Sequence, residues 1–227
     1  MSLIHYLSFA VSPLLIILSV LYLKFKFSIK SFVNIRNAIL LGMLGVVLLL
    51  IANYLIELKW DGNYKNMRRM AFFVFVVIAF SAELAKFIPL KFVFFKLKNF
   101  SGPLEGVIYS IFIGLGFSMI ATVLFAFEIV GSPDKMNNFT VFLFTLPFAN
   151  MVYAITMGFF VGMGKLRKNS FIDSATGLFV ATFFNALFYF GFITSDIRLL
   201  LFIAVGFTVI GLTFIIKSVS LKLEGRK

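Results

Sequence analysis

The feature that most constrains this chain is a series of long apolar segments separated by short polar ones. About 20 apolar residues are needed to cross a hydrocarbon core of about 30 Å as a helix. Seven segments meet this requirement, at residues 3–23, 38–57, 70–90, 103–130, 140–163, 174–194 and 197–216. Hydrophobic residues make up 61% of the 227-residue chain, which leaves no stretch for a soluble domain. The sequence therefore predicts an integral membrane protein.

The fold class follows from how a backbone is satisfied in lipid. Only helices and closed barrels pair all their backbone groups internally and so can span a bilayer. The period-2 alternation of barrel strands is missing from the apolar segments. We expect an all-α fold, a polytopic transmembrane helical bundle of about seven spans, with residues 1–227 forming a single integral membrane domain.

The basic residues indicate orientation in the membrane. A net charge of +12 would suit a nucleic-acid partner, but the Lys and Arg side chains lie in short clusters between apolar segments. Such clusters flank spans in a bilayer, so lipid is the expected partner and nucleic acid is not. The first, third, fifth and last clusters hold 14 basic residues against 6 in the others, although the loop 57–69 holds four. We expect an N-terminus outside and a C-terminus in the cytoplasm, most simply of a prokaryotic plasma membrane.

An ionisable pair interrupts the third apolar segment. Glu83 and Lys86 lie one helical turn apart, and each charge inside a bilayer costs a few kcal/mol, so such residues are functional candidates by default. Lys86 lies five residues before Lys91 and could extend to the surface. Glu83 is too short for that, which makes it the first candidate residue.

Residue counting places further polar groups at the depth of Glu83. From predicted turns near residues 100 and 169, Glu83 is 17 residues away, Ser118 18, Ala121 21, Asn150 19 and Asn185 16. At 1.5 Å per residue they fall within about 8 Å of depth. The sequence thus predicts four helices whose polar groups meet in one internal pocket, although a single membrane Asn is more commonly a contact between helices.

Three motifs in a fixed order resemble a known family. They are Ala82-Glu-Leu-Ala-Lys86, Gly102-Pro-Leu-Glu-Gly-Val-Ile-Tyr-Ser110 and Ile113-Gly-Leu-Gly-Phe-Ser-Met-Ile120. Their order resembles the PrsW-type intramembrane metalloproteases, part of the CAAX-protease and bacteriocin-processing superfamily, over about residues 80–190. The resemblance implies peptide hydrolysis inside the membrane with zinc as the cofactor.

Compared position by position, the sequence keeps many of the family's motif residues but not those that the family uses to bind metal or activate water. The pocket it implies consists of Glu83, Lys86, Glu105, Tyr109, Asn150 and Asn185. Positions where the family has metal ligands or their neighbours are degenerate: Ala82 replaces a Glu, Ala121 and Thr122 replace a Glu-Asn pair, and Asn150 and Asn185 replace two His. The resemblance therefore implies no metal and no cofactor here. Glu105 also fits an ordinary helix start, since it follows Pro103 in a first turn.

Scarcity of metal-binding side chains agrees with that implication. The chain has no Cys and a single His, His5, so it can form neither a cysteine metal site nor a two-histidine one. A hydrolytic site needs about three good ligands and an open position. Glu83 is the only surviving catalytic candidate.

Three hypotheses follow for function. The leading one is a catalytically inactive pseudoprotease whose cavity holds a transmembrane protein or peptide without cutting it, and this chain would then not be an enzyme. The second is an active intramembrane peptidase with a rearranged site around Glu83. The third is a small transporter or ion-relay protein that uses Glu83, for which inverted repeats would be expected. Close-packing glycines such as Gly158 and Gly162 do not reveal an oligomeric state.

Overall fold

The computed structural model describes residues 3–26, 32–60, 66–131, 136, 138–167, 169–194 and 196–224. These residues form helices and short connections, with no strand among them. The elements are α1 (Leu3–Ser8), α2 (Val11–Lys26), α3 (Phe32–Trp60), α4 (Met67–Phe72), the π-helix η1 (Phe73–Phe80), α5 (Ser81–Phe92), the 3-10 helix η2 (Phe94–Lys96), α6 (Pro103–Ala126), α7 (Phe139–Leu166), α8 (Ser170–Thr194) and α9 (Ile197–Glu224). The predicted all-α class is confirmed.

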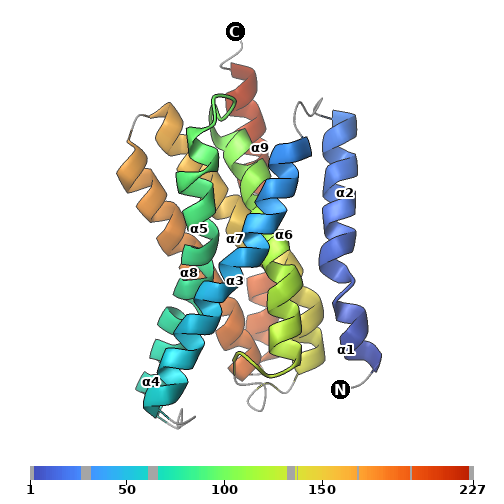
Figure 1. Ribbon diagram of the computed structural model, residues 1–227, viewed down its shortest axis with the longest axis vertical. Coiled ribbons are helices and arrows are strands. Elements are labelled where there is room, and N and C mark those ends of the chain that lie inside the picture. Colours follow the sequence, from blue (N-terminus) through green and yellow to red (C-terminus); the bar gives the residue numbers. More distant parts are fainter. Residues whose placement is uncertain are drawn as a thin grey trace.

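Among the described residues, seven helical stretches are long and apolar enough to cross a membrane, as the sequence predicted. The third begins at Arg68 in α4, runs through η1 and α5, and ends at Lys96 in η2. The chain begins at one end of the bundle and finishes at the other, as an odd number of spans requires (Figure 1). Residues 61–65 of the 57–69 loop lie outside the described part of the chain.

Helix α6 is the centre of the bundle. It packs most extensively against α7 and then against α3, and most of its residues are buried. The backbones approach so closely that a Cβ atom added to Gly158 would lie 2.4 Å from the carbonyl oxygen of Gly106, and one added to Gly116 would lie 2.2 Å from that of Ile39. Small residues at such crossings are typical of membrane helices, and they hold the central helices close together.

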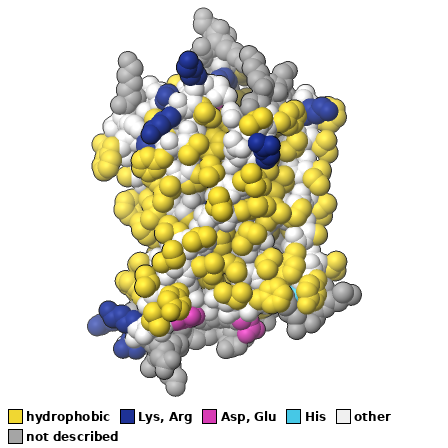
Figure 2. All heavy atoms as spheres, in the orientation of Figure 1, with side chains coloured by type: hydrophobic (Ala, Val, Ile, Leu, Met, Phe, Trp, Pro, Cys, Tyr) yellow, Lys and Arg dark blue, Asp and Glu magenta, His cyan; other side chains and the backbone are white. Residues whose placement is uncertain are grey.

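The outer surface of the bundle is apolar around its middle. Large hydrophobic side chains such as Leu18 on α2, Leu44 on α3 and Val209 on α9 are exposed there. On the face drawn in Figure 2 hydrophobic side chains form a broad belt, basic side chains lie at both ends of it, and the acidic ones lie at the end opposite the C-terminus. This pattern suits a chain whose solvent is lipid around its middle and water at both ends.

Local signals explain where several helices bend or end. Pro103 occupies the first position of α6, where its missing N–H is not needed. The same helix ends before Glu128, whose φ of 61° is left-handed. Pro147 lies inside α7, three residues before Asn150, and Pro89 lies inside α5. The eight-residue π-helix η1 leads directly into α5, and such segments are frequent near functional sites.

Candidate functional site

The charged pair of α5 lies in the protein interior. The side chains of Glu83 and Lys86 are 0% and 2% exposed, and the Lys86 Nζ atom lies 2.6 Å from Glu83 Oε1. The spacing of three residues brings both onto one face of the helix. Lys86 therefore points inward and does not extend along the helix toward Lys91.

Two amides from other helices complete the contacts of this pair. Lys86 Nζ donates to Oδ1 of Asn150 on α7 at 2.6 Å, and Nδ2 of Asn185 on α8 donates to Glu83 Oε1 at 2.8 Å. Asn150 also donates to the carbonyl oxygen of Leu146 at 3.1 Å. We call Glu83, Lys86, Asn150 and Asn185 the polar quartet. The structure brings together Glu83, Asn150 and Asn185, which shared one predicted depth, adds Lys86 to them, and links α5, α7 and α8 through the four side chains.

Aromatic rings surround the ammonium group of the quartet. Lys86 Nζ lies 5.0 Å from the centroid of the Phe117 ring on α6 and 5.4 Å from that of Tyr153 on α7. A cation is attracted to the faces of such rings, more strongly where water is excluded. Tyr153 was not predicted to be a site residue. Its position three residues after Asn150 on the same helix was the available signal.

A small cavity lies against the quartet. It offers about 10 Å³ to the centre of a water molecule, close to the minimum for one water. Its lining includes the degenerate positions Ala82, Ala121, Asn150 and Asn185. Thr122, which follows Ala121 in the chain, is also at a degenerate position. Its hydroxyl group is buried and has no hydrogen-bond partner among the described residues. Four of the five degenerate positions therefore line one void of about the size of a water molecule.

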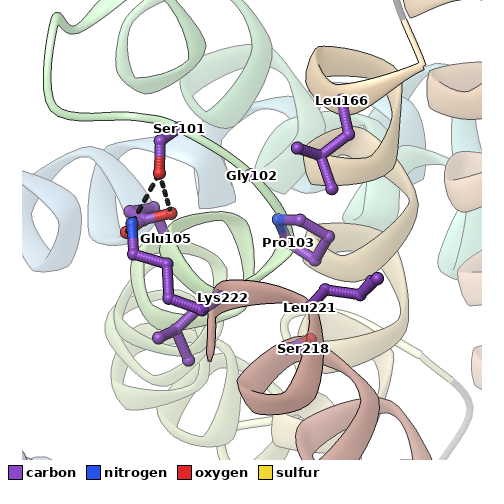
Figure 3. A pocket seen from close by; sticks show the side chains of 9 residues that line it. Ser101, Gly102, Pro103, Glu105, Leu166, Ser218, Leu221 and Lys222 are labelled. Carbon is purple, nitrogen blue, oxygen red and sulfur yellow. Dashed lines mark hydrogen bonds and ion pairs between the residues drawn. The ribbon is translucent and has the colours of Figure 1, made fainter. Parts of the chain in front are cut away.

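Glu105 lies outside this cluster, in a second pocket at the C-terminal end of the bundle. Its Oε1 atom lies 2.6 Å from Lys222 Nζ of α9, and Ser101 donates to its Oε2 atom at 3.1 Å. Figure 3 shows these side chains at the rim of a pocket of about 270 Å³ between the ends of α6, α7 and α9. The expected single pocket thus separates into two places in the bundle.

Tyr109 also lies apart from the polar quartet. Its hydroxyl oxygen accepts hydrogen bonds from Asn34 at 3.4 Å and Asn99 at 3.2 Å. Its ring stacks on those of Phe94 and Phe100, with centroids 4.8 and 6.3 Å away. These contacts join α3, η2 and the loop before α6, so Tyr109 anchors helix ends in this structure.

The donor set of the quartet does not fit a zinc ion. Across the described ranges, no three His, Cys, Asp or Glu side chains form a group that could hold a metal. His5 lies in α1, where its ring is 3.0 Å from the Thr140 hydroxyl at the start of α7. The quartet contributes one carboxylate, two amides and an ammonium group, and an ammonium group offers no lone pair to a metal. This arrangement can hold charge and polar groups in lipid, but it lacks the ligands of a hydrolytic metal.

Comparison with known proteins adds to this geometry. A family model described as PrsW family intramembrane metalloprotease matches residues 33–216. A protease PrsW of Clostridioides difficile (strain 630) is 26% identical over 161 residues, which are 70% of this chain and 66% of that protein. A protease PrsW of Oceanobacillus iheyensis is 29% identical over 163 residues, 72% of this chain and 71% of that protein. The match to the first relative thus spans just under two thirds of its length. No solved structure matches the chain significantly.

Proposed function

Because the chain belongs to the PrsW family of intramembrane metalloproteases, we propose that it is a pseudoprotease of that family. In this proposal it binds a transmembrane protein or peptide and does not cut it. One observation carries the proposal: the ammonium group of Lys86 is held between Glu83 Oε1 and Asn150 Oδ1, at 2.6 Å from each. The Lys86 side chain thus places a positive charge, covalently attached to the chain, beside the degenerate position Asn150. We call this ammonium group the tethered cation.

The tethered cation explains why two amides suit the degenerate positions. An amide oxygen can accept a hydrogen bond from an ammonium group, and an amide NH₂ group can donate to a carboxylate. Asn150 accepts from Lys86, and Asn185 donates to the carboxylate on the other side of the pair. Each amide therefore uses the group that suits its neighbour: Asn150 offers an oxygen to the cation, and Asn185 offers an N–H to the anion. This agreement supports a site selected to hold the charge pair in lipid.

The size of the cavity bears on where a partner docks. A void for one water has no room for a peptide segment. In this proposal the partner therefore docks on the lipid-facing surface of the bundle, and the quartet keeps the helices beneath that surface in place.

Metal analysis of the purified full chain tests the proposal. We expect the wild type to retain no zinc after dialysis against zinc-buffered solution. The triple variant Lys86→Met/Asn150→His/Asn185→His replaces the tethered cation and places two imidazoles beside Glu83, a His₂Glu set that suits zinc. We expect it to retain about one zinc per chain, and the matched variant Lys86→Met to retain none. Stoichiometric zinc in the wild type would refute the proposal.

A second candidate function, an active peptidase, is favoured by one observation. Glu83 Oε2 is buried with no hydrogen-bond partner among the described residues, and Asn185, which donates to the other oxygen of this carboxylate, lines a cavity that can hold one water. A free carboxylate oxygen near a water is the minimum for general-base catalysis. Cleavage of membrane reporter proteins separates the two functions. Cleavage by the wild type that disappears in Glu83→Gln supports the peptidase, and equal absence of cleavage in both supports the pseudoprotease.

A further inference from the structure

Two lysines at the C-terminal end of the bundle converge on one aromatic ring. The Nζ atom of Lys91 on α5 lies 4.1 Å from the centroid of the Phe95 ring, and that of Lys165 on α7 lies 4.8 Å from the same centroid. Lys165 also donates to the carbonyl oxygen of Phe95 at 3.3 Å. The fold thus brings two like charges together, although they repel each other.

Neither of these ammonium groups has an acidic partner among the residues that the structure describes. Of the acidic side chains described at this end, Asp173 and Glu105 form ion pairs with Arg167 and Lys222, and Glu224 accepts a hydrogen bond from Ser220. Lys91 instead donates to neutral oxygens, namely the Ser170 carbonyl at 3.1 Å, the Ser174 hydroxyl at 2.7 Å and the Ser170 hydroxyl. These contacts satisfy its hydrogen bonds but leave its charge unneutralised. An anion from outside the chain would remove the repulsion.

The start of α8 adds to the positive potential of this place. Ser170 is the first residue of α8, a helix of 25 residues, and the first turn of a helix carries a partial positive charge with free N–H groups. The hydrogen bonds of Lys91 to Ser170 fix the ammonium group at that helix start. Asp173 in the first turn of α8 offsets part of this potential and is itself paired with Arg167, so the two lysine charges are the main source of the positive potential here.

The level of the site in the bilayer identifies the anion. Lys91 and Lys165 lie near the ends of two apolar spans, Arg68–Lys96 and Phe139–Leu166, where phospholipid headgroups meet a bundle. Basic sites between transmembrane helices bind anionic headgroups. Phe92 and Val93 follow Lys91 and are 58% and 46% exposed, so apolar surface for acyl chains adjoins the charges. We propose that Lys91 and Lys165 bind the phosphate of an anionic phospholipid.

Native mass spectrometry of the full chain released from phosphatidylcholine nanodiscs that contain phosphatidylglycerol tests this site. The measured quantity is the preference for retained phosphatidylglycerol over phosphatidylcholine. We expect it to fall about 30-fold in Lys91→Gln/Lys165→Gln, since each lysine at the surface contributes comparably. Lys165→Gln alone, at an exposed position that is not expected to affect folding, should lower it about fivefold. Lys91→Arg/Lys165→Arg should retain it.

A matched control removes the same charge from the same end of the bundle. Lys96 and Lys98 are exposed there, and Lys96→Gln/Lys98→Gln should change the preference by less than about threefold, because charges away from the headgroup are screened. An equal loss in both double variants would mean general surface charge and would overturn the site. Displacement of the lipid by inorganic phosphate at matched ionic strength would identify a soluble phosphate ligand and would overturn the assignment to lipid.

Discussion

At the level of single residues, the buried pair of α5 persists because each charge has more than one partner. Moving an ion from water into a low-dielectric interior costs several kcal/mol, and one opposite charge rarely repays that cost without further hydrogen bonds. Glu83 accepts from Lys86 and from Asn185, and Lys86 donates to Glu83 and Asn150. The rings of Phe117 and Tyr153 add cation–π attraction. The inward direction of Lys86 follows from this set of partners.

A double-mutant cycle on this pair should show strong coupling. Lys86→Met leaves the Glu83 carboxylate buried without its countercharge, and we expect it to lower the free energy of unfolding by about 3–5 kcal/mol. The double variant Glu83→Gln/Lys86→Met removes both charges and should lose markedly less than the sum of the two single variants. Thermal and denaturant unfolding in one detergent measures all four proteins. Additive losses would show that the pair does not interact.

The depth of the polar side chains in the bundle was predictable from the sequence, but the direction in which each side chain points was not. A constant rise of 1.5 Å per residue gives the depth of Glu83, Asn150 and Asn185 from counting alone. The same counting puts Glu105, two residues after Pro103, at the end of a span, and the structure places it there beside Lys222. The resemblance had grouped it with Glu83, because motifs order residues along a chain and do not give their depth. Rotation of each helix about its axis depends on packing, which the sequence alone does not supply.

At the level of elements, close contact between α6 and α7 carries the quartet. Asn150 reaches Lys86 only because α7 lies against the central helix along most of its length. Glycines permit that approach, and the sequence indicated the contact face through Gly158 and Gly162. Two details of the elements were not predicted. The first span is broken between Ser8 and Val11, just before Pro13, and η1 is a π-helix, which no simple residue pattern encodes.

Substitution of Gly158 tests the importance of this contact. A Cβ atom there would lie 2.1 Å from Ser110 Oγ and 2.4 Å from the Gly106 carbonyl oxygen, so Gly158→Ala must move α7 away from α6. We expect a loss of about 1–3 kcal/mol in unfolding free energy. Gly206→Ala on α9 is the matched control, since no atom lies within 4 Å of its added Cβ, and it should leave stability unchanged or raise it by up to about 1 kcal/mol. Equal effects of the two substitutions would contradict the close packing.

At the scale of the whole molecule, charge and apolar surface are arranged for a bilayer. On the face drawn in Figure 2 an apolar belt covers the middle of the bundle, and basic side chains lie at both ends of it. This arrangement was predictable, because hydrophobic length and basic clusters are properties of composition along the chain. The tight packing of the interior was not predictable, because the same polar residues in a sequence can line an open pocket or form a tightly packed cluster. The size of the void distinguishes them.

Orientation in the membrane is the prediction that belongs to this scale. We propose that the C-terminal end of the bundle, with Lys91, Lys165 and Lys222, faces the cytoplasm of a prokaryotic cell, because basic residues are retained on that side. The chain has no Cys, so single-cysteine variants can be labelled without background. Lys98→Cys, between α5 and α6, should react with a membrane-impermeant maleimide only after cells are opened.

The opposite end supplies the matching probe. Asp196, exposed at the start of α9, lies at the other end of that helix from Lys222, so Asp196→Cys should react in intact cells. A reversed pattern would place the basic end outside. The anionic-lipid site of Lys91 and Lys165 would then face the outer leaflet, and the clusters of Lys and Arg in this chain would serve lipid binding at the expense of the positive-inside rule.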